Sequence, residues 1–339
     1  MLFAGSDDGV YRFSGIDASD ESTPTQVLDS GRVLRLRTFD ARDGLFAATT
    51  TGLFHSPDGE AWTDLGVPED RVYAVGASGD GSRLYAGTRP AHVYVAEQET
   101  AGGPDDPDGP DDSGDSDDSD DFDSRQWREC EGFQTLPSRE EWRLPRHEDL
   151  AQVRDVHADP AAPDRIVAGV EVGGVHVSDD GGETWAERRE GVNDDIHELH
   201  VVGPGEYVAA TGFGLFRTTD GGESWTRLDE GFDQRYFRTA FSVDGTVYAA
   251  GALANSSTWD DPAADPELFA LRDDTLERVA FPAPDETVTG TTAVDGALVV
   301  ATHRGSVFAR RGDEWDRVGD LPVAADQTGR YTPLARFEG

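Results

Sequence analysis

The chain contains no lysine, so its 29 cationic side chains are all arginines, and they face 68 aspartates and glutamates. The net charge of −39 is spread along the chain, because residues 105–123 hold only 11 of the acidic groups. Nucleic acids and anionic membranes bind to basic protein surfaces. The composition therefore argues against nucleic acid and against a membrane surface as partners.

A surplus of negative charge this large is typical of halophilic proteins from cells that accumulate salt, as halophilic archaea do. In molar salt the screening length is short, so repulsion between carboxylates no longer opposes a compact fold. We therefore expect a halophilic protein whose stability depends on salt.

The sequence also lacks the features of secreted and membrane-spanning proteins. Cys130 is the only cysteine, so no intrachain disulfide can form. No segment approaches the roughly 20 apolar residues of a membrane span, and residues 1–5 begin a strand pattern rather than a signal peptide. We expect a cytoplasmic protein with no membrane insertion. No phosphate-binding loop is present, and no cofactor is predicted.

What the chain has instead is a repeated octet. Residues 178–185 read Ser-Asp-Asp-Gly-Gly-Glu-Thr-Trp, and residues 218–225 read Thr-Thr-Asp-Gly-Gly-Glu-Ser-Trp. Residues 56–62 are a shorter copy, and residues 311–315 are a remnant of a fourth. Each copy predicts a hairpin turn, because glycine adopts positive φ, the aspartate accepts hydrogen bonds from turn N–H groups, and the tryptophan packs on the strand.

The octets resemble the Asp-box, or BNR, repeat of sialidase-like and photosystem-assembly-factor-like β-propellers. The resemblance assigns structural roles to Ser56, Asp58, Trp62, Ser178, Asp180, Gly182, Trp185, Thr218, Asp220, Gly222 and Trp225. In that family the box lies on the side of the propeller away from the ligand. The resemblance therefore implies architecture rather than activity.

A second repeat sets the number of blades. A strand pattern of two large apolar residues followed by alanine and a small residue begins at residues 2, 45, 84, 166, 207 and 247, and a seventh copy with valine in the alanine position begins at residue 298. Most intervals are close to 40 residues, which fits one four-stranded unit each. The first unit lacks its inner strand, and residues 331–337 have the pattern to supply it. We predict an all-β, seven-bladed propeller over residues 1–339, closed by a C-terminal strand in the N-terminal blade.

The interval between the third and fourth units is twice as long as the others. Residues 97–124 are almost free of apolar side chains, which predicts a disordered acidic loop in blade three rather than an eighth blade. Residues 129–149 are interpreted as a long polar connection to blade four. The aspartates of the loop lack the ligand spacing and closing glutamate of an EF-hand, so no metal site is predicted.

The ligand-facing rim is predicted from the alignment of the inner strands. One residue from each falls at an equivalent position near one end of the channel: Leu34, Tyr73, Arg154, His197, Arg238, Thr289 and Thr332. With the neighbouring loops, the predicted rim consists of Tyr73, Arg89, Trp142, Arg154, His197, Arg238, Trp259, His303 and Arg304. Its tryptophans are expected to be exposed and to stack on a sugar or a partner's side chain. Alternatively, the arginines form ordinary surface ion pairs with Asp155, Asp194 or Asp195.

The sequence supports two kinds of function. The first is a non-catalytic scaffold that binds a protein or a glycan through the rim, because scaffold motifs occur without a recognisable catalytic set. The alternative is a glycoside hydrolase, sialidase-like or other, which needs either an arginine cluster with a tyrosine and an acid, or two carboxylates at a defined separation. The rim candidates for that role are Glu171, Asp194, Asp195, Asp260 and Asp261. The Arg-Ile-Pro signature of sialidases is absent, and His197 and His200 would lie on opposite faces of a strand, which argues against a zinc pair.

Overall fold

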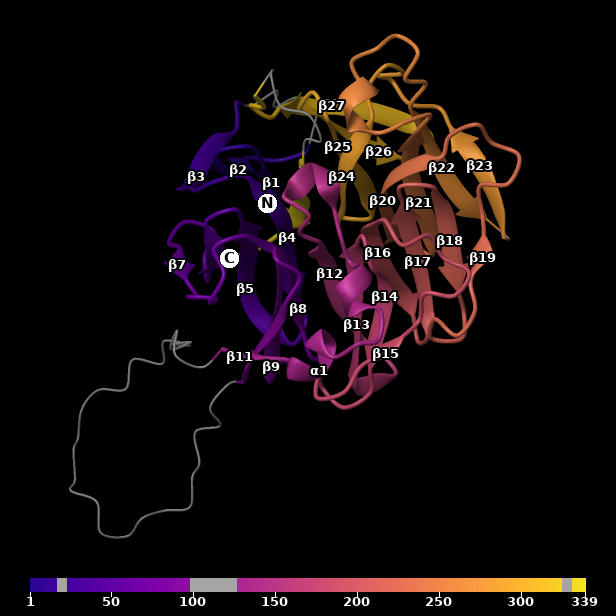
Figure 1. Ribbon diagram of the computed structural model, residues 1–339. Helices are drawn as coiled ribbons and strands as arrows, with labels where there is room; N and C mark the ends of the chain where they lie inside the picture. Colours follow the sequence, from indigo (N-terminus) through magenta and orange to yellow (C-terminus); the bar gives the residue numbers. More distant parts are fainter. Residues whose placement is uncertain (17–22, 98–126, 273, 325–330) are drawn as a thin grey trace, which may run out of the picture.

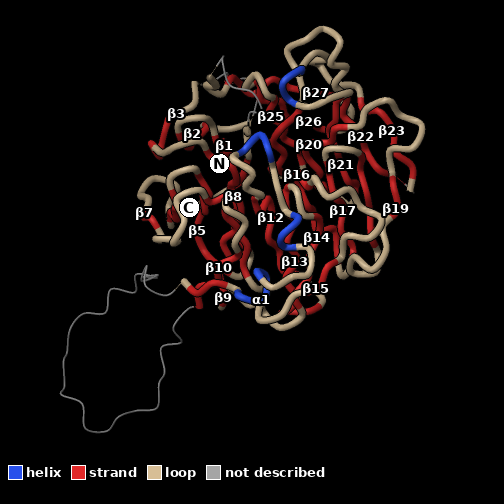
Figure 2. The backbone as a smooth tube through the Cα atoms, in the orientation of Figure 1, coloured by secondary structure: helices blue, strands red, loops and turns tan. Residues whose placement is uncertain are grey.

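The computed structural model describes residues 1–16, 23–97, 127–272, 274–324 and 331–339. These residues form seven four-stranded antiparallel sheets, which follow one another in chain order in a ring (Figure 1). Residues of the inner strands line a central channel. Strands and loops make up nearly all of the described chain (Figure 2). Its few helices are short, and none has the length and apolar character needed to cross a membrane. The predicted all-β, seven-bladed propeller is confirmed.

Each blade runs from an inner strand at the channel to an outer strand. Blades one and two contain β28 (Leu334–Arg336), β1 (Leu2–Gly5), β2 (Gly9–Phe13) and β3 (Thr25–Asp29), then β4 (Val33–Phe39), β5 (Arg42–Thr49), β6 (Gly52–Ser56) and β7 (Thr63–Asp64). Blades three and four contain β8 (Val72–Ala77), β9 (Arg83–Thr88), β10 (Val93–Glu97) and β11 (Arg128–Glu129), then β12 (Gln152–Asp159), β13 (Ala162–Glu171), β14 (Gly174–Ser178) and β15 (Ala186–Glu187). Blade five contains β16 (Ile196–Gly203), β17 (Glu206–Thr211), β18 (Gly214–Thr218) and β19 (Thr226–Arg227). Blades six and seven contain β20 (Tyr236–Val243), β21 (Thr246–Ala252), β22 (Glu267–Arg272) and β23 (Thr275–Val279), then β24 (Val288–Val294), β25 (Ala297–Thr302), β26 (Ser306–Arg311) and β27 (Glu314–Asp320).

The ring closes in blade one, as the sequence predicts. β28 pairs antiparallel with β1, with Ala335 opposite Phe3. Next to this pair, the amino group of Met1 donates to the Phe337 carbonyl at 2.8 Å, and the Phe337 N–H donates to the Met1 carbonyl at 3.1 Å. The two ends of the chain therefore share one sheet, and no open edge is left between blades one and seven.

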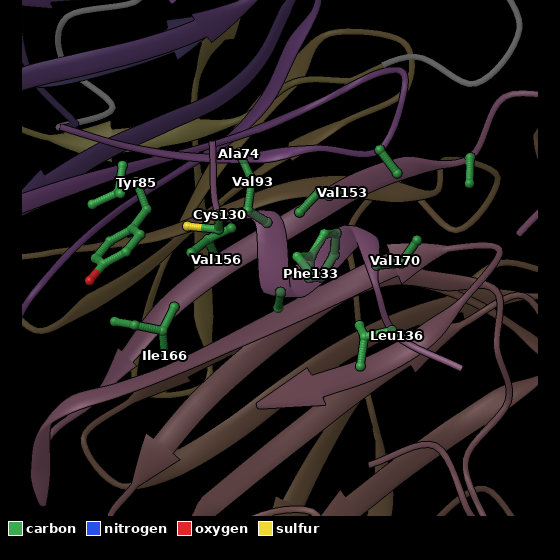
Figure 3. Packing of buried hydrophobic residues seen from close by; sticks show 14 of the residues in the cluster. Ala74, Tyr85, Val93, Cys130, Phe133, Leu136, Val153, Val156, Ile166 and Val170 are labelled. Carbon is green, nitrogen blue, oxygen red and sulfur yellow. The ribbon is translucent and has the colours of Figure 1, made fainter. Parts of the chain in front are cut away.

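The apolar core is divided among the gaps between neighbouring blades. Small residues in the second strands let the blades approach: a Cβ on Gly87 of β9 would lie 2.5 Å from the Val153 side chain of the next blade. Figure 3 shows this gap, where Tyr85 of blade three and Ile166 of blade four belong to one buried cluster. Partly buried tryptophans pack against five different clusters, one each: Trp62, Trp127, Trp185, Trp225 and Trp315.

The octets form turns between the third and fourth strands of blades two, four and five. In blade four the Ser178 hydroxyl accepts a hydrogen bond from the Gly182 N–H at 2.8 Å and donates to Asp180 at 2.8 Å. Asp180 in turn accepts from the Thr184 N–H at 2.8 Å. Equivalent contacts recur among Thr218, Asp220, Gly222 and Ser224, and around Ser56 and Asp58. Because successive strands alternate in direction, these turns lie on the face away from the beginnings of the inner strands.

The connection to blade four differs from the predicted polar segment. It contains α1 (Glu131–Gln134) and the 3₁₀ turns η3 (Arg139–Glu141) and η4 (Pro145–His147). Its apolar side chains Phe133, Leu136, Trp142 and Leu144 are buried. The interpretation as a polar connection was wrong, because Phe133, Leu136 and Trp142 join the buried cluster between blades three and four. Apart from Glu97, the predicted loop 97–124 lies outside the described residues.

Candidate binding site at the channel mouth

A β-bulge recurs at one position in six inner strands. In each of them the pairing with the second strand skips one residue, namely Leu34, Tyr73, Arg154, His197, Arg238 and Thr289. A bulged residue is left out of the ladder and its side chain is re-aimed. These are the positions that the sequence alignment places together, and all six side chains are buried rather than displayed on an outer rim.

Five of the bulged residues line a cavity of about 910 Å³, which we call the channel mouth. It lies where the inner strands begin, and the closing segment adds Tyr331 to its wall. The charged groups that line it are six arginines and two carboxylates: Arg32, Arg71, Arg89, Arg146, Arg154, Arg238, Asp7 and Glu171. On a chain of net charge −39, this part of the described surface therefore has the opposite sign.

Glu171 is the anion that organises the mouth. Its Oε1 accepts from Arg146 at 2.6 Å, and its Oε2 accepts from Arg154 at 3.1 Å and from Gln152 at 2.7 Å. Burial raises the pKa of Glu171, but Arg154, His197 and Arg146 outweigh burial and lower it to about 2. Glu171 is therefore a carboxylate whose oxygens already have partners.

Three arginines of the mouth, Arg71, Arg89 and Arg238, have no carboxylate partner within the described chain, and two of them, Arg238 and Arg89, lie against tyrosine rings. Arg238 is 6% exposed, and its guanidinium lies 4.2 Å from the centre of the Tyr331 ring. Arg89 lies 5.6 Å from the centre of the Tyr73 ring, and its Nε is buried without a hydrogen-bond partner. Burial and the nearby Arg154 lower the pKa of Arg238. These two cations are available to an incoming anion.

His197 faces a carboxylate beneath the mouth. Its Nδ1 lies 2.7 Å from the Phe237 carbonyl, which only accepts, so Nδ1 carries a proton. Its Nε2 lies 3.6 Å from Asp195. His197, Asp195 and Glu171 offer ligand atoms within 4.8 Å of one another, the spacing of a metal site. However, Arg146 lies 2.6 Å from Glu171 and 3.7 Å from Asp195, so a guanidinium already neutralises both carboxylates.

The structure brings together part of the predicted rim. Tyr73, Arg89, Arg154, His197 and Arg238 line the mouth, whereas Trp142, Trp259, His303 and Arg304 are not among its lining residues. Arg304 is instead ion-paired with Asp260 at 3.3 Å and with Asp285 at 2.6 Å.

The predicted exposure of the two tryptophans was wrong, since Trp142 is 4% exposed and Trp259 is 2% exposed. The Trp142 indole packs against Phe133, with ring centres 5.1 Å apart. Trp259 meets the rings of Tyr236 at 6.0 Å and His303 at 5.6 Å. Both indoles are core side chains, so neither is free to stack on a ligand.

The alternative interpretation, that the rim arginines pair with Asp155, Asp194 or Asp195, was wrong about the partners. Arg154 is paired with Glu171, and Arg238 is paired with no carboxylate in the described chain. Asp155 is instead bound by two arginines that sequence reasoning did not single out, Arg35 and Arg37.

Several residues of the mouth were missed. Arg146 and His147 come from η4, at the end of the long connection, and Tyr331 comes from the closing segment. Tyr331 directly precedes Thr332, which the alignment did identify, so its neighbourhood was the available signal. Nothing comparable marks Arg146, because its position depends on how the connection packs.

The buried carboxylate of the mouth, Glu171, does not suit glycoside hydrolysis. A glycosidase needs one carboxyl group that stays protonated and donates to the leaving group. Glu171 has a lowered pKa, and Arg146 also lies near Asp195. Asp260 is ion-paired with Arg304, outside the mouth. Of the rim candidates, Glu171 is therefore unsuited to the role of proton donor.

Comparisons place the fold among known propellers. No protein-family model and no curated protein matches the chain. Among solved structures, the GH74 xyloglucanase from Xanthomonas campestris matches 98% of this chain at 15% identity with a TM-score of 0.63, but only 52% of the enzyme is covered. YCF48 bound to D1 peptide matches 84% of this chain and 81% of its own at 14% identity and a TM-score of 0.53. YCF48 from Cyanidioschyzon merolae gives 84% of both chains, 12% identity and 0.52. At these identities the likeness shows the fold alone.

Proposed function

We propose that the protein is a non-catalytic scaffold and that its channel mouth binds an acidic segment of a partner protein. The observation that carries this proposal is that Arg238 and Arg89, in the wall of a cavity large enough for several side chains, lie against tyrosine rings and have no carboxylate partner in the described chain. A carboxylate gains most from a guanidinium when the pair is shielded from water and the fork binds both oxygens.

The fold is compatible with this role. One structure of the same fold, YCF48, is described with a bound D1 peptide. The tyrosines of the mouth add flat apolar surface beside Arg89 and Arg238, which suits the side chains that flank a carboxylate in a peptide. A glycan is the less suited partner, because both tryptophans expected to stack on sugar are buried.

A capture experiment tests the proposal. The purified full-length chain serves as bait, at molar salt, in extract of its source organism, and captured proteins are identified and compared among variants. Arg238→Gln together with Arg89→Gln should abolish capture of the specific partner. Arg304→Gln is the matched control, because Arg304 is an ion-paired arginine outside the mouth. Equal capture by the wild type, the double variant and Arg304→Gln would mean that the partner binds to another surface.

We further propose a relationship to Asp-box propellers and a halophilic, cytoplasmic setting. Relationship to Asp-box propellers would make the octets structural turns on the face opposite the partner. A halophilic, cytoplasmic setting would account for the acidic composition. Each of these stays a prediction of the sequence.

A further inference from the structure

In the unliganded protein, the charge of the Arg238 guanidinium is mostly buried and is not neutralised by a neighbouring carboxylate of the described residues. The side chain is 6% exposed, and no acceptor for it is found in the described chain. Removing a charge from water without a counter-charge is strongly unfavourable. The Tyr331 ring at 4.2 Å offers a cation–π contact, which offsets only part of that loss.

The surrounding cations and rings form a row. Arg89 and Arg154 lie 5.6 Å and 6.0 Å from the centre of the Tyr73 ring. Arg154 and Arg238 lie 4.6 Å and 4.2 Å from the centre of the Tyr331 ring. Of the three arginines, only the middle one has a carboxylate, Glu171, and that carboxylate is shared with Arg146.

Neighbouring titratable groups respond to this positive charge. The pKa of His147 is lowered by burial and then by Arg89, and the pKa of Arg238 is lowered by burial and then by Arg154. Arg238 also lines a second cavity of about 490 Å³, further along the channel. An anion beside Arg238 is thus reachable from either cavity.

We propose that Arg238, beside Arg154, binds a free monovalent anion such as chloride or formate whenever no partner occupies the mouth. Such an anion supplies the missing counter-charge without any change in the fold. Partner binding is then an exchange, in which a carboxylate of the partner displaces the free anion from Arg238. This exchange rests on the proposed function. Affinity for the partner then falls as the concentration of a competing small anion rises, at constant ionic strength.

Chloride is the probe, observed by ³⁵Cl NMR with the full-length chain at fixed ionic strength held by potassium fluoride. The wild type should broaden the chloride line, and formate should reverse the broadening. Arg238→Gln should lose the formate-sensitive part, whereas Arg304→Gln should retain it. Crystals of the wild type in bromide provide a second measurement, with an anomalous peak expected against the Arg238 guanidinium.

The outcomes separate this inference from the proposed function. Full formate-sensitive broadening in a folded Arg238→Gln variant, or no bromide at Arg238, overturns the anion site even if partner capture depends on Arg238. Chloride that binds at Arg238 but is not displaced by the captured partner supports the anion site and contradicts the proposed partner surface.

Discussion

Arg35 of blade two donates to the Asp155 carboxylate of blade four at 2.9 Å, although blade three lies between them in the ring. Asp155 also accepts from Arg37 at 2.9 Å and from the Leu199 N–H of blade five at 2.9 Å. Burial raises the pKa of Asp155, but Arg35, His157 and Arg37 together hold it far below the usual range. Asp155 of blade four therefore links blades two and five to its own blade across the channel.

Asp155→Asn should destabilise the fold by about 3 kcal/mol, because it leaves two guanidinium groups with less compensation in a buried position. Equilibrium denaturation at constant salt measures the loss. Asp313→Asn is the control, since Asp313 pairs with Arg310 while fully exposed, and its effect should be negligible. Similar midpoints for the two variants would contradict the assigned role.

Gly290→Ala should weaken ring closure, because a Cβ there would lie 1.7 Å from the Thr332 carbonyl oxygen of the closing segment. We expect a loss of about 1–3 kcal/mol, typical of overpacking against backbone. Gly203→Ala is the matched control, since a Cβ on Gly203 meets no atom within 4 Å and that variant should match the wild type. Thermal melts of the two variants decide the point, and equal melting temperatures would argue against a tight closure.

Thr218→Val should cost about 1–3 kcal/mol, because it removes the acceptor of the buried Gly222 N–H while keeping the shape of the side chain. The exposed neighbour gives the control Thr219→Val. Denaturant unfolding measures stability, and partner capture should be unaffected because the turn lies on the opposite face. An unchanged midpoint for Thr218→Val would mean that the octet contributes little to stability.

Stability should fall as the pH drops below about 6.5, the ordinary pKa of histidine. Burial lowers the pKa values of His176 and His200 to about 3. Below about pH 6.5 these two histidines therefore bind protons in the unfolded chain but not in the folded chain. Each histidine then lowers the free energy of unfolding by about 1.4 kcal/mol for each pH unit. His200→Gln should reduce the slope of unfolding free energy between pH 6.5 and about 5 by one proton's worth. An identical slope in both proteins would show that His200 is protonated in the fold.

Lowering the salt concentration should destabilise the fold. The screening length grows from about 3 Å at 1 M to about 10 Å at 0.1 M salt, so repulsion among the carboxylates acts over longer distances. With a net charge of −39, the melting temperature should decline steadily over that range. A melting temperature independent of salt would count against the halophilic interpretation.

The sequence predicted the fold well because a propeller repeats a local pattern. The alternating strand pattern and the turn octets depend on neighbours close in sequence, and the number of blades then follows from counting. The closing strand was predicted because the first unit lacks an inner strand, although its partner β1 lies at the other end of the chain. The same alignment located the bulged residues, including Arg154 and Arg238, without showing that they are bulged. Their burial in the channel depends on the tilt of the strands, which a single sequence does not specify.

The errors concern contacts between distant segments. Trp142 was expected on the surface because its own segment is polar, yet its partners include His176 of blade four. Trp259 is covered by rings from β20 and from the loop after β25. Arg146 escaped notice because the path of the connection follows from the packing of Phe133 and Trp142, not from a repeat.

The recurrent bulge also has a consequence for how the binding specificity of such a propeller can change. Six of the seven blades contribute one side chain to the channel from a position outside the backbone ladder, so exchanging that side chain leaves the pairing of the strands intact. Evolution, or a designer, can thus rewrite what the opening recognises one blade at a time, while the sheets that carry it stay the same.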